Sequence, residues 1–299
     1  MYTRFLTPLT ASDGENLALY KWQPEDSTKL DPQKAAKRGL VLIVHGLGEH
    51  AGRYDHVAHR LQNWGFEVRA YDQRGHGVSG GKPGVIPTST ALLDDLADIV
   101  DDVRSHHLGL PLILLGHSLG GLLASRFVSL NIRPVDALVL SSPALDAGLS
   151  AFQKLLLKVL PRRAPDLCVG NGLDANYLSR DPKVVKAYLA DRMVHNKISA
   201  RLAEFIATAG PATLAVAGSW RTPTLLMYAG ADKLVNPAGS ATFARRASRS
   251  KSIELGIKPD MKLGTVTSKR FDGYYHELFN EVDAAPVFAL LKSWLDARF

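Results

Sequence analysis

The sequence contains one cysteine, Cys168, among its 299 residues. A single cysteine cannot form an intramolecular disulfide, so the stability of the fold does not depend on an oxidising compartment. No run approaches the roughly 20 apolar residues that cross a bilayer, and the first residues include no apolar signal-peptide segment. These absences predict a cytoplasmic protein.

Clusters of basic residues and nucleic-acid-binding motifs are also missing. Lys and Arg number 36 against 29 Asp and Glu, a formal net charge of +7, but they are spread along the chain. We therefore expect no nucleic-acid partner. The charge serves solubility or, alternatively, attraction to an anionic surface. We interpret an acidic set as a solvated helix face rather than a metal site: Asp94, Asp95, Asp98, Asp101 and Asp102.

Short apolar runs alternate with segments of helical periodicity along most of the chain. The runs that predict strands are 17–22, 39–44, 66–71, 111–115, 135–140, 222–228 and 269–274. Helical patterns occupy 54–64, 88–108, a segment that ends near 130, and 284–299. This alternation predicts an α/β fold with a mostly parallel central sheet and helices on both faces.

Residues 146–219 interrupt the alternation. The segment shows helical patterns with Pro and Gly punctuation and no convincing strand. We therefore predict a core formed by residues 1–145 and 220–299. Residues 146–219 form an inserted helical cap over the carboxyl ends of the strands.

The segment Gly116–Gly120 fits the pattern G-x-S-x-G between a predicted strand and a predicted helix. That context is typical of a nucleophile elbow, a sharp turn that exposes a serine hydroxyl above the sheet. Ser118 is the candidate nucleophile, and the backbone N–H of Leu119 points to where an oxyanion would form. The alternative is a tight turn with an inert serine.

A serine hydroxyl needs a base and an acid to act as a nucleophile. His276 follows the last predicted strand and is the candidate base. Asp232 is the first carboxylate after the preceding strand and is the candidate acid, with Asp260 and Asp272 as competitors. Asp232 could instead merely cap the next helix.

The second oxyanion donor is expected in the loop after an early strand. The glycine-rich segment His45–Gly48 is placed for this role, and the backbone N–H of Leu47 is the candidate. A glycine-rich turn without that role is the alternative.

Several motifs resemble the serine α/β-hydrolases, and more narrowly the monoacylglycerol lipase and lysophospholipase-like group. They are His45–His50, Gly52–Tyr54, Tyr71–Ser79, Gly116–Gly121 and Gly230–Asp232. The resemblance implies Ser118 as nucleophile, Asp232 as acid, His276 as base, and Leu47 and Leu119 as oxyanion donors. It also implies a cap that recognises one acyl chain, and no cofactor. A polar stretch at 258–268 makes the connection before His276 longer than is usual in this group.

Apolar residues of the predicted cap form a stripe at helical spacing, namely Phe152, Leu155, Leu156, Val159 and Leu160. Three interpretations are open. The stripe lines an acyl tunnel, with Phe152, Leu155, Leu156 and Val159 as substrate-binding residues; it rests on an anionic lipid surface; or it packs against the domain.

The sequence thus predicts a serine hydrolase of carboxylic esters that acts through an acyl-enzyme. The favoured substrate is a monoacylglycerol or a lysophospholipid-like monoacyl ester. A peptidase or amidase with the same three residues is one alternative, and a non-catalytic binding protein on the same fold is another.

Overall fold

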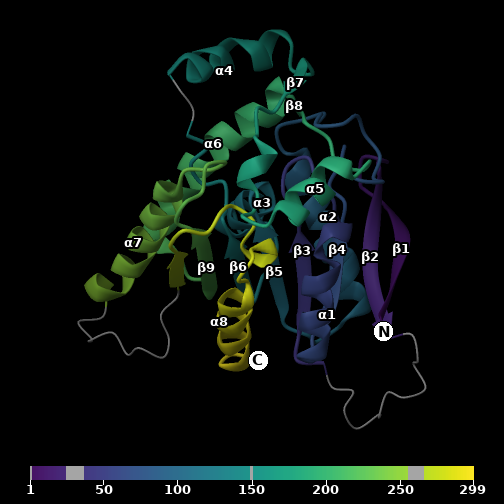
Figure 1. Ribbon diagram of the computed structural model, residues 1–299, viewed down its shortest axis with the longest axis vertical. Helices are drawn as coiled ribbons and strands as arrows, with labels where there is room; N and C mark the ends of the chain where they lie inside the picture. Colours follow the sequence, from purple (N-terminus) through teal and green to yellow (C-terminus); the bar gives the residue numbers. More distant parts are fainter. Residues whose placement is uncertain (1, 25–36, 149–150, 255–265) are drawn as a thin grey trace.

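The computed structural model describes residues 2–24, 37–148, 151–254 and 266–299, and within them eight strands form a central sheet (Figure 1). The strands, in spatial order, are β1 (Tyr2–Thr10), β2 (Asn16–Pro24), β4 (Glu67–Tyr71), β3 (Leu40–Val44), β5 (Leu112–His117), β6 (Ala137–Ser141), β9 (Thr224–Ala229) and β10 (Val266–Phe271). The β1–β2 and β2–β4 pairs are antiparallel, and the other pairs are parallel. The predicted mostly parallel sheet is confirmed.

Successive residues of the central strands enter two separate hydrophobic cores. On β3, Leu40, Leu42 and Val44 belong to one core, whereas Val41 and Ile43 belong to the other. All five residues of this strand are buried. A strand covered on both faces reads as a continuous apolar run, which is why β3 is visible in the sequence.

Helices cover both faces of the sheet. Side chains of α2 (Ala91–His106), α3 (Leu119–Ser129), α6 (Ala200–Val216) and α7 (Pro237–Glu254) contribute to the first core. Side chains of α1 (Asp55–Asn63) and α8 (Ala285–Asp296) contribute to the second. Because the central strands are parallel, the loops after β3, β5, β9 and β10 all leave from one edge, where sites of α/β proteins form.

The predicted cap segment adds no strand to the central sheet. It contains α4 (Ala151–Arg163), η4 (Ala175–Tyr177), α5 (Pro182–Ala190), α6 and η5 (Ala217–Ser219). Figure 1 shows α4 beyond the rest of the chain, on the side opposite α8. The expectation that the segment lacks strands is wrong, because β7 (Cys168–Gly170) pairs antiparallel with β8 (Lys197–Ser199). Strands of three residues are too short to show a periodic pattern.

The expectation that no segment has the length and composition to span a membrane is wrong for helix α6 and the residues that follow it. Residues 200–219 meet that criterion, and they are the one such stretch among the described residues. In the structure, however, α6 packs against α3, α4 and α7. Leu202 and Phe205 of this helix are buried in the first core, and 33% of the stretch is buried in all.

Two further differences concern strands at opposite ends of the sheet. Strand β1 is absent from the sequence predictions, because it is an edge strand whose Phe5 and Leu6 stay exposed. Strand β10 ends at Phe271, earlier than predicted, so Asp272 lies beyond the strand rather than inside it. Asp260 and most of the polar stretch at 258–268 lie outside the described residues.

One aspartate of the acidic set on α2 is not part of a solvated face. Asp95 is buried, and its Oδ1 lies 2.6 Å from Nη2 of Arg74. Such a charge is tolerated in the interior because it is paired. No cluster of metal-ligating side chains occurs among the described residues.

Candidate active site

Ser118 sits in a strained turn between β5 and α3. Its φ is 53° and its ψ is −118°, a backbone conformation that residues other than glycine rarely adopt. The turn is held by its own backbone, since Ser118 donates its N–H to Ser141 and accepts from Ala144, each at 3.0 Å. The side chain is only partly buried. This is the geometry that a nucleophile elbow requires.

Gly120 allows the elbow to approach the neighbouring strand. A Cβ added there would lie less than 3.0 Å from the carbonyl oxygens of Val44 and His45. The first turn of α3 therefore lies directly against the end of β3. This close approach places Leu119, the first residue of α3, beside the loop that contains Leu47.

The structure brings Asp232 and His276 together although 44 residues separate them. Nδ1 of His276 lies 2.7 Å from Oδ2 of Asp232, and both side chains are almost fully buried. The other oxygen of Asp232 accepts the N–H groups of Leu234 and Val235 at 2.9 and 3.0 Å. Asp232 thus orders its own turn, as the alternative interpretation held, and also binds the imidazole.

The two groups shift each other's proton affinity. Burial alone would lower the pKa of His276, but the charge and hydrogen bond of Asp232 outweigh it and raise this pKa above 6.5. Burial would raise the pKa of Asp232, but the His276 charge and the three hydrogen bonds lower it below 3.8. A neutral imidazole that is held in this way, and whose basicity is raised by Asp232, can accept a proton from a hydroxyl beside it.

Both the imidazole of His276 and the predicted oxyanion loop lie near the elbow. The ring of His117, the residue before Ser118, has its centroid 4.7 Å from that of His276. A Cβ added at Gly46 would lie 3.2 Å from Cβ of Ser118. Leu47 follows Gly46 and is half-buried. The residues predicted from the sequence for the chemistry therefore gather at one edge of the sheet.

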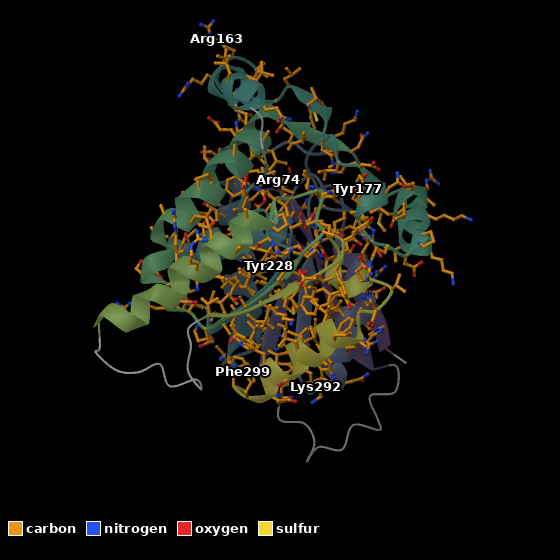
Figure 2. The ribbon with its side chains drawn as sticks, turned by 60° about the vertical axis from the view of Figure 1, so that its left-hand side comes forward. Arg74, Arg163, Tyr177, Tyr228, Lys292 and Phe299 are labelled. Atoms are coloured by element: carbon orange, nitrogen blue, oxygen red, sulfur yellow. The ribbon has the colours of Figure 1, made fainter. Side chains whose placement is uncertain are left out.

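The cap segment hydrogen-bonds the loops on both sides of the elbow. The N–H of His195 donates to the carbonyl of Gly48 at 2.9 Å, and the N–H of Glu277 donates to the carbonyl of Leu178 at 2.8 Å. Figure 2 labels Tyr177, whose ring lies 5.8 Å from that of Tyr275. The cap is thus attached to both loops through backbone groups.

The apolar stripe of α4 is exposed to solvent, unlike the buried side chains of Asp232 and His276. Leu155 and Val159 of α4 are 58% and 53% exposed, and Leu156 is also exposed. The side chain of Phe152 lies outside the described residues. Arg163 at the end of α4 and Phe299 lie at opposite ends of the molecule (Figure 2). The exposure argues against packing of these three residues on the domain, and their role in substrate binding stays a prediction.

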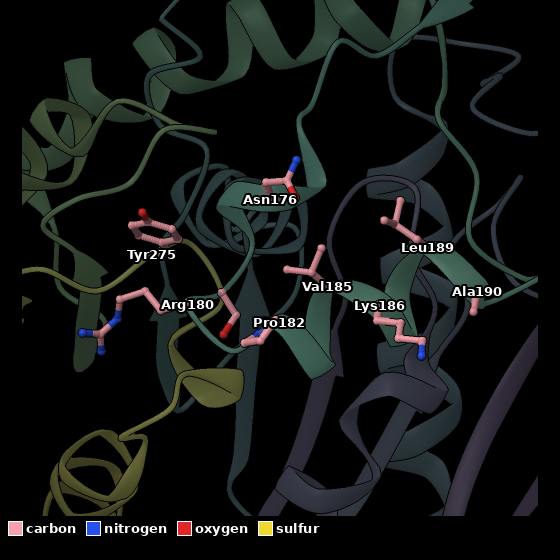
Figure 3. A pocket seen from close by; sticks show the side chains of 9 residues that line it. Asn176, Arg180, Pro182, Val185, Lys186, Leu189, Ala190 and Tyr275 are labelled. Atoms are coloured by element: carbon pink, nitrogen blue, oxygen red, sulfur yellow. The ribbon is translucent and has the colours of Figure 1, made fainter.

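A separate hollow of about 700 Å³ lies along α5 (Figure 3). Val185 and Lys186 line it together with Tyr275, the neighbour of His276. The residues that line this hollow do not include the predicted substrate-binding residues Leu155, Leu156 and Val159.

The sequence analysis assigned no role to three charged residues near the elbow. Glu49, Arg53 and Glu277 form a buried network of ion pairs. Glu49 and Arg53 belong to motifs that carry the family resemblance, which is the one signal that could have singled them out. Their pairing joins residues more than 220 positions apart, which no local pattern encodes.

Comparisons with known proteins agree with this geometry. Residues 35–283 match the family model Hydrolase_4, described as serine aminopeptidase, S33. The chain is 37% identical to a monoacylglycerol lipase of Mycolicibacterium smegmatis, over 86% of this chain and 88% of that protein. It is 30% identical to the phospholipase YtpA of Bacillus subtilis, over 86% and 95%. The crystal structure of a Paleococcus ferrophilus monoacylglycerol lipase superposes with a TM-score of 0.75 at 34% identity, covering 87% and 95%.

Proposed function

Because the chain belongs to the serine aminopeptidase S33 family of α/β-hydrolases, we propose that it is a serine hydrolase that cleaves monoacyl carboxylic esters through an acyl-enzyme. The observation that carries the chemistry is the buried Asp232–His276 pair at the elbow of Ser118. The observation that carries the substrate class is the similarity to monoacylglycerol lipases over most of the chain.

In the proposed reaction, Ser118 attacks the ester carbonyl while Nε2 of His276 takes its proton. Asp232 holds Nδ1, so that the free nitrogen faces the serine, and it stabilises the imidazolium. The backbone N–H groups of Leu47 and Leu119 stabilise the oxyanion. The imidazolium then protonates the leaving alcohol, and water releases the acid by the same steps.

The substrate class follows from the relatives as a group. Monoacylglycerol lipases and a phospholipase both act on lipid esters, and the chain covers most of each. A monoacylglycerol or a lysophospholipid-like ester is therefore favoured over a peptide or an amide. The cap, residues 146–219, supplies the contacts to a single acyl chain in this proposal. A cytoplasmic location stays a prediction.

The test of the chemistry compares wild type with Ser118→Ala. The variant is expected to lose hydrolysis of a short p-nitrophenyl ester and labelling by a fluorophosphonate, with its unfolding midpoint preserved. Hydrolysis at the wild-type rate by the variant would disprove the assignment. A series of monoacylglycerols of increasing chain length, run beside aminoacyl p-nitroanilides, decides between esterase and peptidase; faster cleavage of the anilides would favour the peptidase.

The exposed stripe of α4 supports transient contact of the cap with a lipid surface. Leu155 and Val159 present apolar groups to solvent, and Arg162 and Arg163 close the same helix. The double variant Leu155→Ser/Val159→Ser is expected to sediment less with anionic vesicles than wild type. Leu189→Ser on α5, an apolar side chain that is 69% exposed, is the control. Equal sedimentation of all three proteins would contradict the contact.

A further inference from the structure

A network of three buried charges lies against the elbow. Nη1 of Arg53 lies 2.5 Å from Oε2 of Glu49 and 2.6 Å from Oε1 of Glu277, and Nη2 lies 2.8 Å from Oε2 of Glu277. The three side chains are 11%, 5% and 4% exposed. The guanidinium also stacks on the ring of Tyr188 from α5, at 4.8 Å. Charges buried to this degree are screened weakly by solvent.

One end of the network holds the oxyanion loop. Oε1 of Glu49 accepts the N–H of Gly46 at 2.6 Å and the hydroxyl of Tyr54 at 2.7 Å. A Cβ on Gly46 would lie 2.9 Å from Oε1 of Glu49 and 3.2 Å from Cβ of Ser118. Gly46 is therefore enclosed between the carboxylate and the serine. The carboxylate fixes the peptide that leads into Leu47.

The other end holds the histidine loop. Glu277 is the residue after His276. Its carboxylate accepts hydrogen bonds from both terminal nitrogens of the Arg53 guanidinium. Asn280 donates to the same carboxylate at 2.8 Å. The fork geometry restricts the position of Glu277 and hence of the preceding backbone. The distance between the oxyanion loop and the imidazole is thus set through one arginine.

The network also places a net negative charge near the imidazole of His276. Two carboxylates against one guanidinium leave one net negative charge. The ionisable groups that face His276 are Asp232 after β9, His117 at the end of β5, and Glu49, Arg53 and Glu277. Burial lowers the pKa of His117 to about 4, so that ring is neutral near pH 7. After Asp232, the charges of Glu277 and Glu49 favour the protonated form of His276.

We propose that Glu49, Arg53 and Glu277 are positioning residues for the proposed hydrolysis. They set the oxyanion loop relative to Ser118, and their net negative charge stabilises the imidazolium that His276 becomes during each step. This inference rests on the proposed function and adds residues that act through the groups already assigned.

Glu277→Gln tests the charge, because the substitution keeps the shape and removes the net negative charge. We expect kcat on a monoacylglycerol to fall at least about tenfold, with KM nearly unchanged. The acid limb of kcat/KM is expected to move to lower pH by about 0.5 unit or more, because the imidazolium loses a stabilising charge.

Arg53→Lys tests the geometry, because it keeps the charge and removes the fork. Its kcat is expected to fall while its acid limb stays in place. Asp95→Asn is the matched control, since it removes one charge from the equally buried pair with Arg74. It is expected to lower the unfolding midpoint and to leave the acid limb where it is.

A folded Glu277→Gln variant with kcat within twofold of wild type and an unmoved acid limb overturns the proposal. If that variant does not fold, Glu49→Gln gives the same readout, and a wild-type kcat for Arg53→Lys overturns the positioning role by itself. Failure of the proposed function is distinguishable, because then Ser118 of the wild type would resist fluorophosphonate labelling.

Discussion

The contact between the first turn of α3 and the end of β3 gives a direct prediction for Gly120→Ala. The new Cβ would lie less than 3.0 Å from two carbonyl oxygens, where ordinary contact begins at 3.4 Å. The helix and strand must therefore separate by more than 0.4 Å, the difference between these distances. Backbone atoms in a packed core cannot yield as a flexible side chain does.

We expect Gly120→Ala to lower the free energy of unfolding by up to about 2 kcal/mol. Overpacking of this kind costs up to about 3 kcal/mol, and the better helix propensity of alanine offsets about 1 kcal/mol of that. Because the displaced carbonyls belong to Val44 and His45, directly before the oxyanion loop, kcat on a p-nitrophenyl ester is also expected to fall.

Urea unfolding monitored by circular dichroism measures the stability, and ester turnover measures the catalytic effect. Gly218→Ala is the control, because no atom lies within 4 Å of its added Cβ and the residue is exposed. That variant is expected to stay within about 0.5 kcal/mol of wild type. Equal stability and activity of the two variants would refute the argument from close approach.

Three other predictions follow from the same structure. Ser118→Gly is expected to raise the free energy of unfolding by about 1 kcal/mol while abolishing turnover, because glycine adopts the positive φ without strain; a lower unfolding midpoint would contradict this. Asp232→Asn is expected to fold and to lose about 10⁴-fold in kcat, because the imidazole of His276 is no longer held in the required tautomer. Since the pKa of Asp232 is lowered on folding, its stabilisation is present above pH 3.8 and is lost as pH falls through the folded value, so the stability difference between variant and wild type should shrink in acid. Tyr20→Phe is expected to cost about 1 kcal/mol in urea unfolding, because it removes the hydroxyl that donates to buried Asp72 at 2.8 Å.

The central strands and the elbow could be predicted because local sequence encodes them. Strands β3 and β5 are buried on both faces, so they appear as apolar runs. The elbow needs glycines at fixed offsets from Ser118, and the structure shows the close approach that requires Gly120. His276 and Asp232 could be assigned because parallel strands bring their ends to one edge.

The remaining features depend on tertiary contacts. The β7–β8 pair is held by three residues on each side, and neither side forms a pattern alone. Asp95 looks like one more surface aspartate until Arg74 is placed against it. The exposure of Leu155 on α4 is likewise a property of where the helix stands, because the same stripe would suit a packed helix.

The attachment of the cap by main-chain groups limits how such an enzyme can be remodelled. The carbonyl of Gly48 and the N–H of Glu277 each find a partner in the inserted segment. Grafting a foreign insertion onto this scaffold, or trimming it to a linker, would expose both groups unless the new piece presented an amide and a carbonyl at the same two points. Under the proposed function, in which the inserted segment contacts the acyl chain, changes in acyl preference are therefore expected to be easier to obtain by altering side chains within the insertion than by exchanging it whole.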